Sequence, residues 1–182
     1  MKIGALKETL LGERRVALTP DSAVQLQKLG YVCLVEKDSG LAAGFSDEQY
    51  KSVGVEIVDT PNELTEACDV ILANCYPFWE GCPLEYSSIY MKEMYNQAVA
   101  AGQGKKVIIT ETGWPNLGSS FEGSHPSYKN AMKYFINTQQ WSKSDDIETF
   151  YFSSFDESWK VGDEGDVGAF WGIWDKDEKL KY

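Results

Sequence analysis

The sequence predicts an α/β protein with a single open, mostly parallel, doubly wound sheet and helices on both faces. Strand-like and helix-like segments alternate along the whole chain, which is the pattern of parallel sheets. The run at residues 70–75 is almost continuously apolar, as in a strand covered on both faces. Polar capping residues and prolines precede amphipathic stretches, as they do at helix starts.

The first part of the chain supplies three strands and three helices. We expect strands at residues 2–6, 32–36 and 56–58, and helices at residues 21–29, 46–53 and 62–68. Thr19 and Pro20 provide a cap and a first-turn proline for the first of these helices, and Gly30 ends it.

The second part continues the alternation. It has strand patterns at residues 70–75, 106–110 and 149–155, and helix patterns at residues 84–101 and 128–142. Right-handed crossovers then give one six-stranded sheet of order 3-2-1-4-5-6. We expect one domain, residues 1–182, made of the parts 1–72 and 73–182. A partial or closed (β/α) barrel is the alternative.

Charge and hydropathy exclude several classes of partner. The net charge of −11 argues against nucleic acid and anionic membranes, and it suits a neutral ligand such as a sugar. No apolar run is long enough to span a bilayer, and no signal-peptide pattern follows Met1. We therefore expect a soluble chain that is cytoplasmic when produced recombinantly. Its natural location and its self-association stay open.

Cysteine and histidine usage argues against a metal site. The four cysteines form no CxxC pair, and Cys33 and Cys68 lie in or beside apolar runs. We therefore expect reduced thiols and no disulfide framework. His125 is the only histidine, which argues against a histidine zinc site and against a Ser-His-Asp triad. No metal is predicted.

The composition changes within the chain. All six tryptophans lie at or after Trp79, so an aromatic-poor first part meets an aromatic-rich second part. The junction falls inside the strand-like run DVILANCYPFWEG, residues 69–81, without a Pro/Gly/Ser linker. Because natural domain boundaries favour exposed linkers, this junction indicates two joined fragments.

Residues 1–72 contain KETLLGERRVALTP and LAAGFSDEQY and closely resemble the amino terminus of alanine dehydrogenase and of the nicotinamide nucleotide transhydrogenase α subunit. The resemblance implies that Arg15 holds a substrate carboxylate, and a surface arginine is the alternative. The family's lysine is missing after DVIL, and no GxGxxG occurs anywhere in the chain. We therefore expect no dehydrogenase activity and no nicotinamide or other cofactor.

Residues 70–182 contain YPFWEG, VIITETGWP, FYFSSFDESWK and EGDVGAFWGIWDKDEKLKY. These motifs resemble family 17 glycoside hydrolases, the β-1,3-glucanases and β-1,3-glucanosyltransferases. The resemblance implies that Glu111, at the end of a strand, is the catalytic nucleophile. It also implies a set of sugar-binding residues: Tyr76, Phe78, Trp114, Asp156, Glu157, Trp159 and Lys160.

Retaining hydrolysis needs a second carboxyl as acid and base, about 5–5.5 Å from the nucleophile. In the family this glutamate lies in an Asn-Glu pair on the fourth strand of a (β/α) barrel, whereas the resemblance covers the last three strands. The one Asn-Glu pair here, Asn62-Glu63, follows Thr60-Pro61 and is expected to open a helix. Glu157 is left as a candidate partner for Glu111.

The sequence therefore predicts an engineered chimeric α/β scaffold without natural catalytic activity. It would keep remnants of a β-1,3-glucan site and contact β-glucan weakly. The alternative is a β-1,3-glucan hydrolase or glucanosyltransferase with Glu111 as nucleophile. A carboxylate-binding remnant that uses Arg15 is a third, more distant hypothesis.

Overall fold

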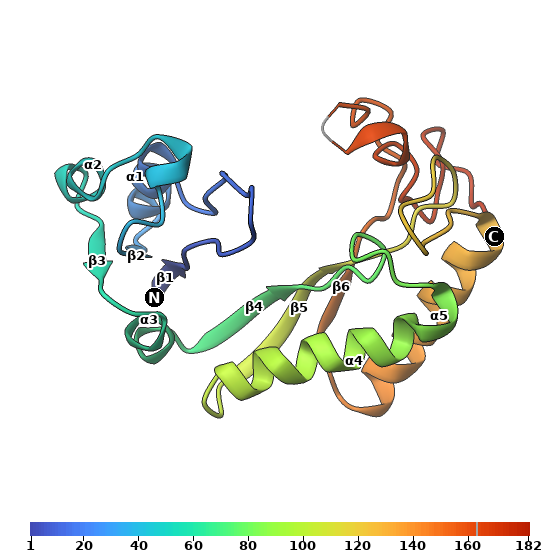
Figure 1. Cartoon of the computed structure of the whole chain (residues 1–182), viewed down its shortest axis with the longest axis horizontal. Helices are drawn as coiled ribbons and strands as arrows, with labels where there is room; N and C mark the ends of the chain where they lie inside the picture. Colours follow the sequence, from blue (N-terminus) through green and yellow to red (C-terminus); the bar gives the residue numbers. More distant parts are fainter. Residues whose placement is uncertain (163) are drawn as a thin grey trace. The chain divides into compact units, whose positions relative to one another are not determined.

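The computed structural model describes residues 1–162 and 164–182, which form two compact units, Met1–Asp69 and Val70–Tyr182 (Figure 1). Each unit has its own open, three-stranded, parallel sheet with helices. The α/β class and the open parallel sheets are confirmed, and no closed barrel is formed by the described residues.

The prediction of one six-stranded sheet is wrong. Strand β4 (Val70–Asn74) pairs with β5 and not with β1 (Lys2–Ala5), so the described strands form two sheets. The apolar run of β4 predicted a central strand. Such a run is equally compatible with an edge strand that is packed under a helix. Local pattern identifies a strand, whereas tertiary packing selects its partner.

In the first unit, β2 (Val32–Glu36) lies between β1 and β3 (Glu56–Val58), so the predicted order 3-2-1 of these strands is confirmed. The helices are α1 (Pro20–Lys28), α2 (Asp47–Ser52) and α3 (Pro61–Ala67), with a short 3-10 turn at Leu41–Ala43. The core of this unit is a cluster of small and medium apolar side chains closed by one aromatic ring: Ala5, Leu18, Ala23, Cys33, Val35, Tyr50 and Val55.

Local capping signals explain where these helices begin. Thr19 caps α1, where its side chain accepts a hydrogen bond from the Ser22 amide. Thr60 caps α3 in the same way, through the amide of Glu63. The Glu63 carboxylate in turn accepts a hydrogen bond from the Asp59 amide at 3.0 Å. The Asn62-Glu63 pair therefore belongs to a helix start, as predicted.

In the second unit, β5 (Lys106–Thr112) lies between β4 and β6 (Thr149–Tyr151). Helices α4 (Leu84–Ala101) and α5 (Tyr128–Ser144) contact each other and run side by side along the sheet (Figure 1). Strand β5 is longer than expected by two residues, and β6 ends four residues early. Beyond β6 the chain has little regular structure apart from a 3-10 turn at Gly165–Val167.

Cys33, Cys75 and Cys82 are free thiols and are buried. Burial raises the pKa of the Cys75 thiol to about 11, because the thiolate would lose its hydration. No helix in the described part of the chain is both long and apolar enough to cross a membrane.

Tyr50→Phe tests the core of the first unit. The Tyr50 ring is fully buried, and its hydroxyl donates a 2.7 Å hydrogen bond to the Leu18 carbonyl. Removing the hydroxyl leaves that carbonyl unsatisfied, so we expect the free energy of unfolding to fall by about 1–3 kcal/mol. Urea unfolding followed by circular dichroism measures the change, with Tyr31→Phe at a less buried position as control.

The same variant tests whether the chain unfolds as one cooperative domain. All tryptophans belong to the second unit, so tryptophan fluorescence reports that unit alone. If Tyr50→Phe shifts the fluorescence transition as much as the dichroism transition, the two units unfold together. An unchanged fluorescence midpoint contradicts the expected single cooperative domain.

Candidate active site

Glu111 lies near the carboxyl end of β5, the central strand of the second sheet. The ladder between β4 and β5 shifts register here, so that Asn74 pairs with Glu111 and one residue of β5 is skipped. Such a bulge turns a side chain away from the regular alternation of a strand. The next residue, Thr112, is buried, and its hydroxyl lies 2.6 Å from that of Tyr134. The strand end is therefore held rigidly beneath Glu111.

Tyr76 follows β4 and brings a donor to Glu111. Its hydroxyl donates a 2.9 Å hydrogen bond to Oε2 of the Glu111 carboxylate. Burial raises the pKa of Tyr76 strongly, and the negative charge of Glu111 raises it further. The phenol therefore stays protonated and holds the carboxylate in one orientation.

One tryptophan and two phenylalanines surround Tyr76 and Trp171 with edge-to-face and tilted contacts. The Tyr76 ring meets Trp171 edge-on at 5.5 Å between centroids and Phe152 at 6.5 Å. Trp171 also packs against Phe78 and Trp79. These arrangements are the ones that aromatic quadrupoles favour. Trp171 is itself a core residue, with an exposure of 3%.

Phe78 and Trp114 do not face solvent. Their relative exposures are 0% and 1%, and the two rings pack edge-to-face at 5.3 Å. The indole nitrogen of Trp114 donates to the His125 carbonyl at 3.1 Å. In this structure neither ring can contact a sugar, which corrects the expectation for both. A cluster with this many aromatic side chains fills its own interior, and these two rings form the packed layer below the site.

Trp159, Lys160 and Glu157 fit the sugar-binding expectation better. The Trp159 side chain is largely exposed, at 72%. The Lys160 ammonium lies 4.2 Å from the centroid of the Phe152 ring and 3.2 Å from the Glu157 carboxylate. This lysine therefore ties Glu157 to the aromatic cluster that contains Tyr76.

Glu164 is a carboxylate that the sequence reasoning missed. It lies 3.7 Å from the Lys160 ammonium, and its charge also contributes to raising the pKa of Tyr76. Because Tyr76 holds Glu111, Glu164 belongs to the same electrostatic neighbourhood. Glu164 is the first residue of the motif EGDVGAFWGIWDKDEKLKY, but the resemblance assigned no role to it. The i,i+4 spacing from Lys160 was the available signal.

Asp156 is a structural residue. One of its carboxylate oxygens accepts from the Gly172 amide at 3.0 Å and from the Lys181 ammonium at 2.6 Å. The side chains of this ion pair are 11% and 4% exposed. The ion pair between Asp156 and Lys181 links the carboxyl-terminal segment to the loop after β6. The expectation that Asp156 binds sugar hydroxyls is corrected, since its oxygen is occupied by a buried cation.

Arg15 lies in the first unit and faces Glu13. Its guanidinium donates to both oxygens of the Glu13 carboxylate, the shorter contact being 2.6 Å. The hydrogen bonds from Arg15 lower the pKa of Glu13 to about 2. The arginine side chain is 88% exposed. Arg15 belongs to the first unit and Glu111 to the second, so the role of Arg15 in holding a substrate carboxylate stays a prediction.

A carboxylate at the carboxyl end of a central parallel strand, oriented by a tyrosine within an aromatic cluster, is typical of a glycoside hydrolase. Residues 34–172 match the BtgE/BtgC glycoside hydrolase domain. The chain belongs to this family.

Curated relatives include a glucan 1,3-beta-glucosidase of Saccharomyces cerevisiae. It is 30% identical over an alignment of 161 residues, which covers 78% of this chain and 51% of the relative. A solved β-1,3-glucanosyltransferase from Rhizomucor miehei superposes with a TM-score of 0.65 at 26% identity, covering 90% of this chain and 56% of that one. The chain thus spans about half the length of these glucan-active relatives.

The resemblance of the amino-terminal region to the transhydrogenase α subunit is confirmed as well. The amino-terminal region is 54% identical to the NAD(P) transhydrogenase subunit alpha of Cereibacter sphaeroides over 72 residues, 40% of this chain and 14% of the relative. The glycoside hydrolase match begins at residue 34, inside the first unit, so the two similarities overlap in that unit.

The buried ion pair yields a prediction. Asp156→Asn leaves the Lys181 ammonium buried without its partner, and we expect the free energy of unfolding to fall by about 3–5 kcal/mol. Urea unfolding followed by tryptophan fluorescence measures it. Asp177→Asn is the control, because its pair with Lys176 is largely exposed and is expected to contribute less than about 1 kcal/mol. The double variant Asp156→Asn/Lys181→Met should recover part of the loss; a further loss would contradict the ion-pair explanation.

Proposed function

We propose that the second unit keeps a remnant of a β-1,3-glucan active site that binds glucan weakly and does not cleave it by itself. The observation that carries this proposal is the hydrogen bond from Tyr76 to Glu111 at the carboxyl end of the central strand. It holds a carboxylate where a family 17 glycoside hydrolase has its nucleophile, next to exposed aromatic surface. The named activities of the relatives supply the substrate class.

The exposed residues provide the contacts that a glucan needs. The face of Trp159 can stack on the apolar face of a glucose ring, because the ring is open to solvent. Lys160 and Glu157 can hydrogen-bond sugar hydroxyls at the edge of the aromatic cluster. The hydrogen bond from Tyr76 holds the Glu111 carboxyl group in one orientation. A glucan is a neutral polymer that carries many hydroxyl groups, and it suits this combination of aromatic and charged side chains.

The missing component is the general acid. The only Asn-Glu pair, Asn62-Glu63, is used in capping α3 of the other unit. The Glu157 carboxylate is engaged by the Lys160 ammonium at 3.2 Å. Loss of a general acid typically lowers the rate about 10²–10⁴-fold. We therefore conclude that Glu111 has no partner to protonate a departing sugar.

We further propose that the chain is an engineered chimeric scaffold. A transhydrogenase-like fragment and a glycoside-hydrolase-like fragment meet at β4, with neither family's complete set of catalytic residues. The competing proposal is a β-1,3-glucan hydrolase or glucanosyltransferase. It is favoured by Glu157 and Glu164, since both carboxylates lie around Lys160 and the charge of Glu164 also acts on Tyr76.

Binding is tested by calorimetric titration with laminaritriose. We expect a dissociation constant on the order of 1 mM, and Trp159→Ala should weaken binding about fivefold to tenfold through loss of the stacking face. Phe150→Ala, at a similarly exposed aromatic residue on β6, is the matched control and should leave binding unchanged. Equal affinity for cellotriose would contradict a β-1,3-specific site.

Turnover is tested by release of reducing sugar from laminarin. We expect none above background from the unaltered chain or from Glu111→Gln, because the general acid is absent. Hydrolysis that Glu111→Gln abolishes would favour the competing hydrolase. Repeating that assay with Glu157→Gln and Glu164→Gln would then identify the carboxyl that replaces the missing acid.

A further inference from the structure

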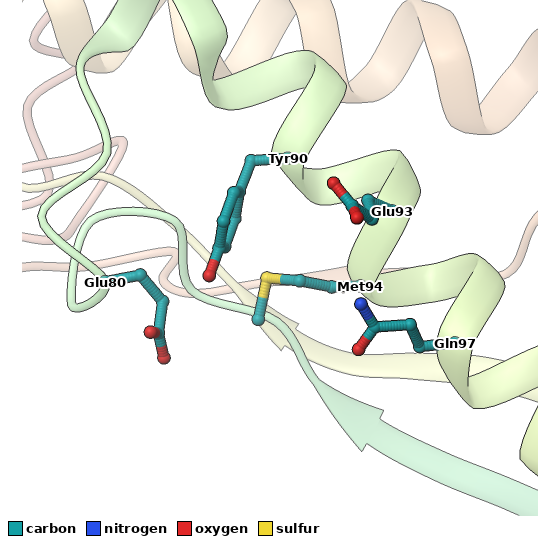
Figure 2. Close-up of a pocket in the computed structure, with 5 residues that line it drawn as sticks. All are labelled: Glu80, Tyr90, Glu93, Met94 and Gln97. Atoms are coloured by element: carbon teal, nitrogen blue, oxygen red, sulfur yellow. The ribbon is translucent and has the colours of Figure 1, made fainter.

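A cavity of about 340 Å³ lies along α4 and shares none of its lining with the residues predicted to bind sugar (Figure 2). Two elements of the second unit form it. Glu80 belongs to the loop after β4, and the other four lining residues lie on α4: Tyr90, Glu93, Met94 and Gln97. Their spacing of i, i+3, i+4 and i+7 places these four on one side of the helix. The volume is sufficient for a small molecule.

A turn after β4 fixes the position of Glu80. The Glu80 amide donates to the Tyr76 carbonyl at 3.3 Å, and the Gly81 amide donates to the Phe78 carbonyl at 3.0 Å. The Phe78 side chain is fully buried in the aromatic cluster, so the turn is attached to the packed interior of the unit. The Glu80 carboxylate is therefore presented to α4 by a well-supported segment of backbone.

Two carboxylates make the cavity negative. Burial raises the pKa of Tyr90, and the charges of Glu80 and Glu93 raise it further, so both carboxylates act on the same phenol. None of the five lining side chains is a cation. Lys92, which lies between Tyr90 and Glu93 in the sequence, has its ammonium 5.8 Å from the centroid of the Trp141 ring on α5. The cavity therefore favours a positively charged ligand.

The same cavity has an apolar part. Figure 2 shows the Tyr90 and Met94 side chains extending from α4 toward the loop that carries Glu80. A thioether and an aromatic ring pack well against methylene groups, and the ring face also attracts an ammonium group. The Gln97 amide oxygen can accept a hydrogen bond from such a group. Anionic groups from two elements, combined with apolar surface, are suited to an aliphatic amine.

A metal ion fits these residues less well. Hard divalent cations take six or more oxygen ligands, and the lining offers two carboxylates beside a thioether. Within residues 1–162 and 164–182, no group of three or more histidine, cysteine or acidic side chains could hold a metal ion. A neutral sugar would leave the two carboxylates without a charged partner. These comparisons favour an organic cation.

We propose that the cavity binds an aliphatic diamine. One ammonium pairs with Glu80, and the other contacts Glu93 and the Gln97 amide oxygen. The methylene chain between them lies against the Tyr90 ring and the Met94 thioether. This site is separate from the glucan site and does not depend on the proposed function.

The test is a titration of the full chain with cadaverine, followed by nuclear magnetic resonance of isotope-labelled methionine methyl groups. Met94 lines the cavity, whereas Met91 is buried in the core and Met132 lies on α5. The variant Met94→Leu identifies the Met94 signal. At constant ionic strength we expect this signal to shift with a dissociation constant on the order of 5 mM, while the Met132 signal stays in place.

Two comparisons separate the cavity from general attraction of cations. The variant Glu80→Gln/Glu93→Gln should raise the dissociation constant about fivefold or more, because both ion pairs are lost. Glu85→Gln/Asp177→Asn removes the same charge at exposed positions outside the cavity and should leave the dissociation constant unchanged. Amylamine, which has the same carbon chain and one ammonium, should bind about threefold more weakly. The circular dichroism spectrum of each variant verifies its folding.

Three outcomes overturn the inference. The first is the absence of a shift in the Met94 signal, and the second is equal affinity for amylamine and cadaverine. The third is an equal effect of Glu80→Gln/Glu93→Gln and Glu85→Gln/Asp177→Asn on the dissociation constant. That result would mean that the net charge of −11 attracts the diamine to the whole surface.

Discussion

The pairing of β5 with β4 on one side and β6 on the other is the constraint on which the second unit depends. Parallel strands end at the same edge of a sheet, so residues far apart in sequence meet there. Glu111 ends the central strand, Tyr76 follows β4, and Phe152 follows β6. The Phe152 amide donates to the Thr112 carbonyl at 2.8 Å, which continues the pairing beyond β6. Without this pairing, Tyr76 would have no carboxylate to orient.

The aromatic cluster divides the second unit into a packed layer and a surface layer. Phe78, Trp114 and Trp171 are buried and support the strand end, while Trp159 remains exposed beside Lys160. The Trp171 indole nitrogen is buried without a hydrogen-bond partner in the described residues. An unmatched buried donor costs free energy, which the aromatic packing around it offsets.

The chain resembles two families and forms regular elements in both of its units. Helix α3 ends at Ala67 and β4 begins at Val70, so the boundary of the two compact units falls between two regular elements. Each unit keeps an apolar core made from its own residues. Both fragments follow the same alternation of strand and helix, and the hydrolase match accordingly extends back to residue 34.

The sequence by itself determined the elements, the two family resemblances and the candidate carboxylate. Helix starts at Thr19 and Thr60 follow from caps that act within a few residues, and the strands from apolar runs of similar range. Only the tertiary structure decided that β4 is an edge strand and that Asp156 is held by Lys181. Strand pairing and side-chain burial depend on contacts between distant segments, which a local pattern does not encode. The same aromatic residues can line a cleft or fill a core, and the packing around Phe78 and Trp114 selected the core.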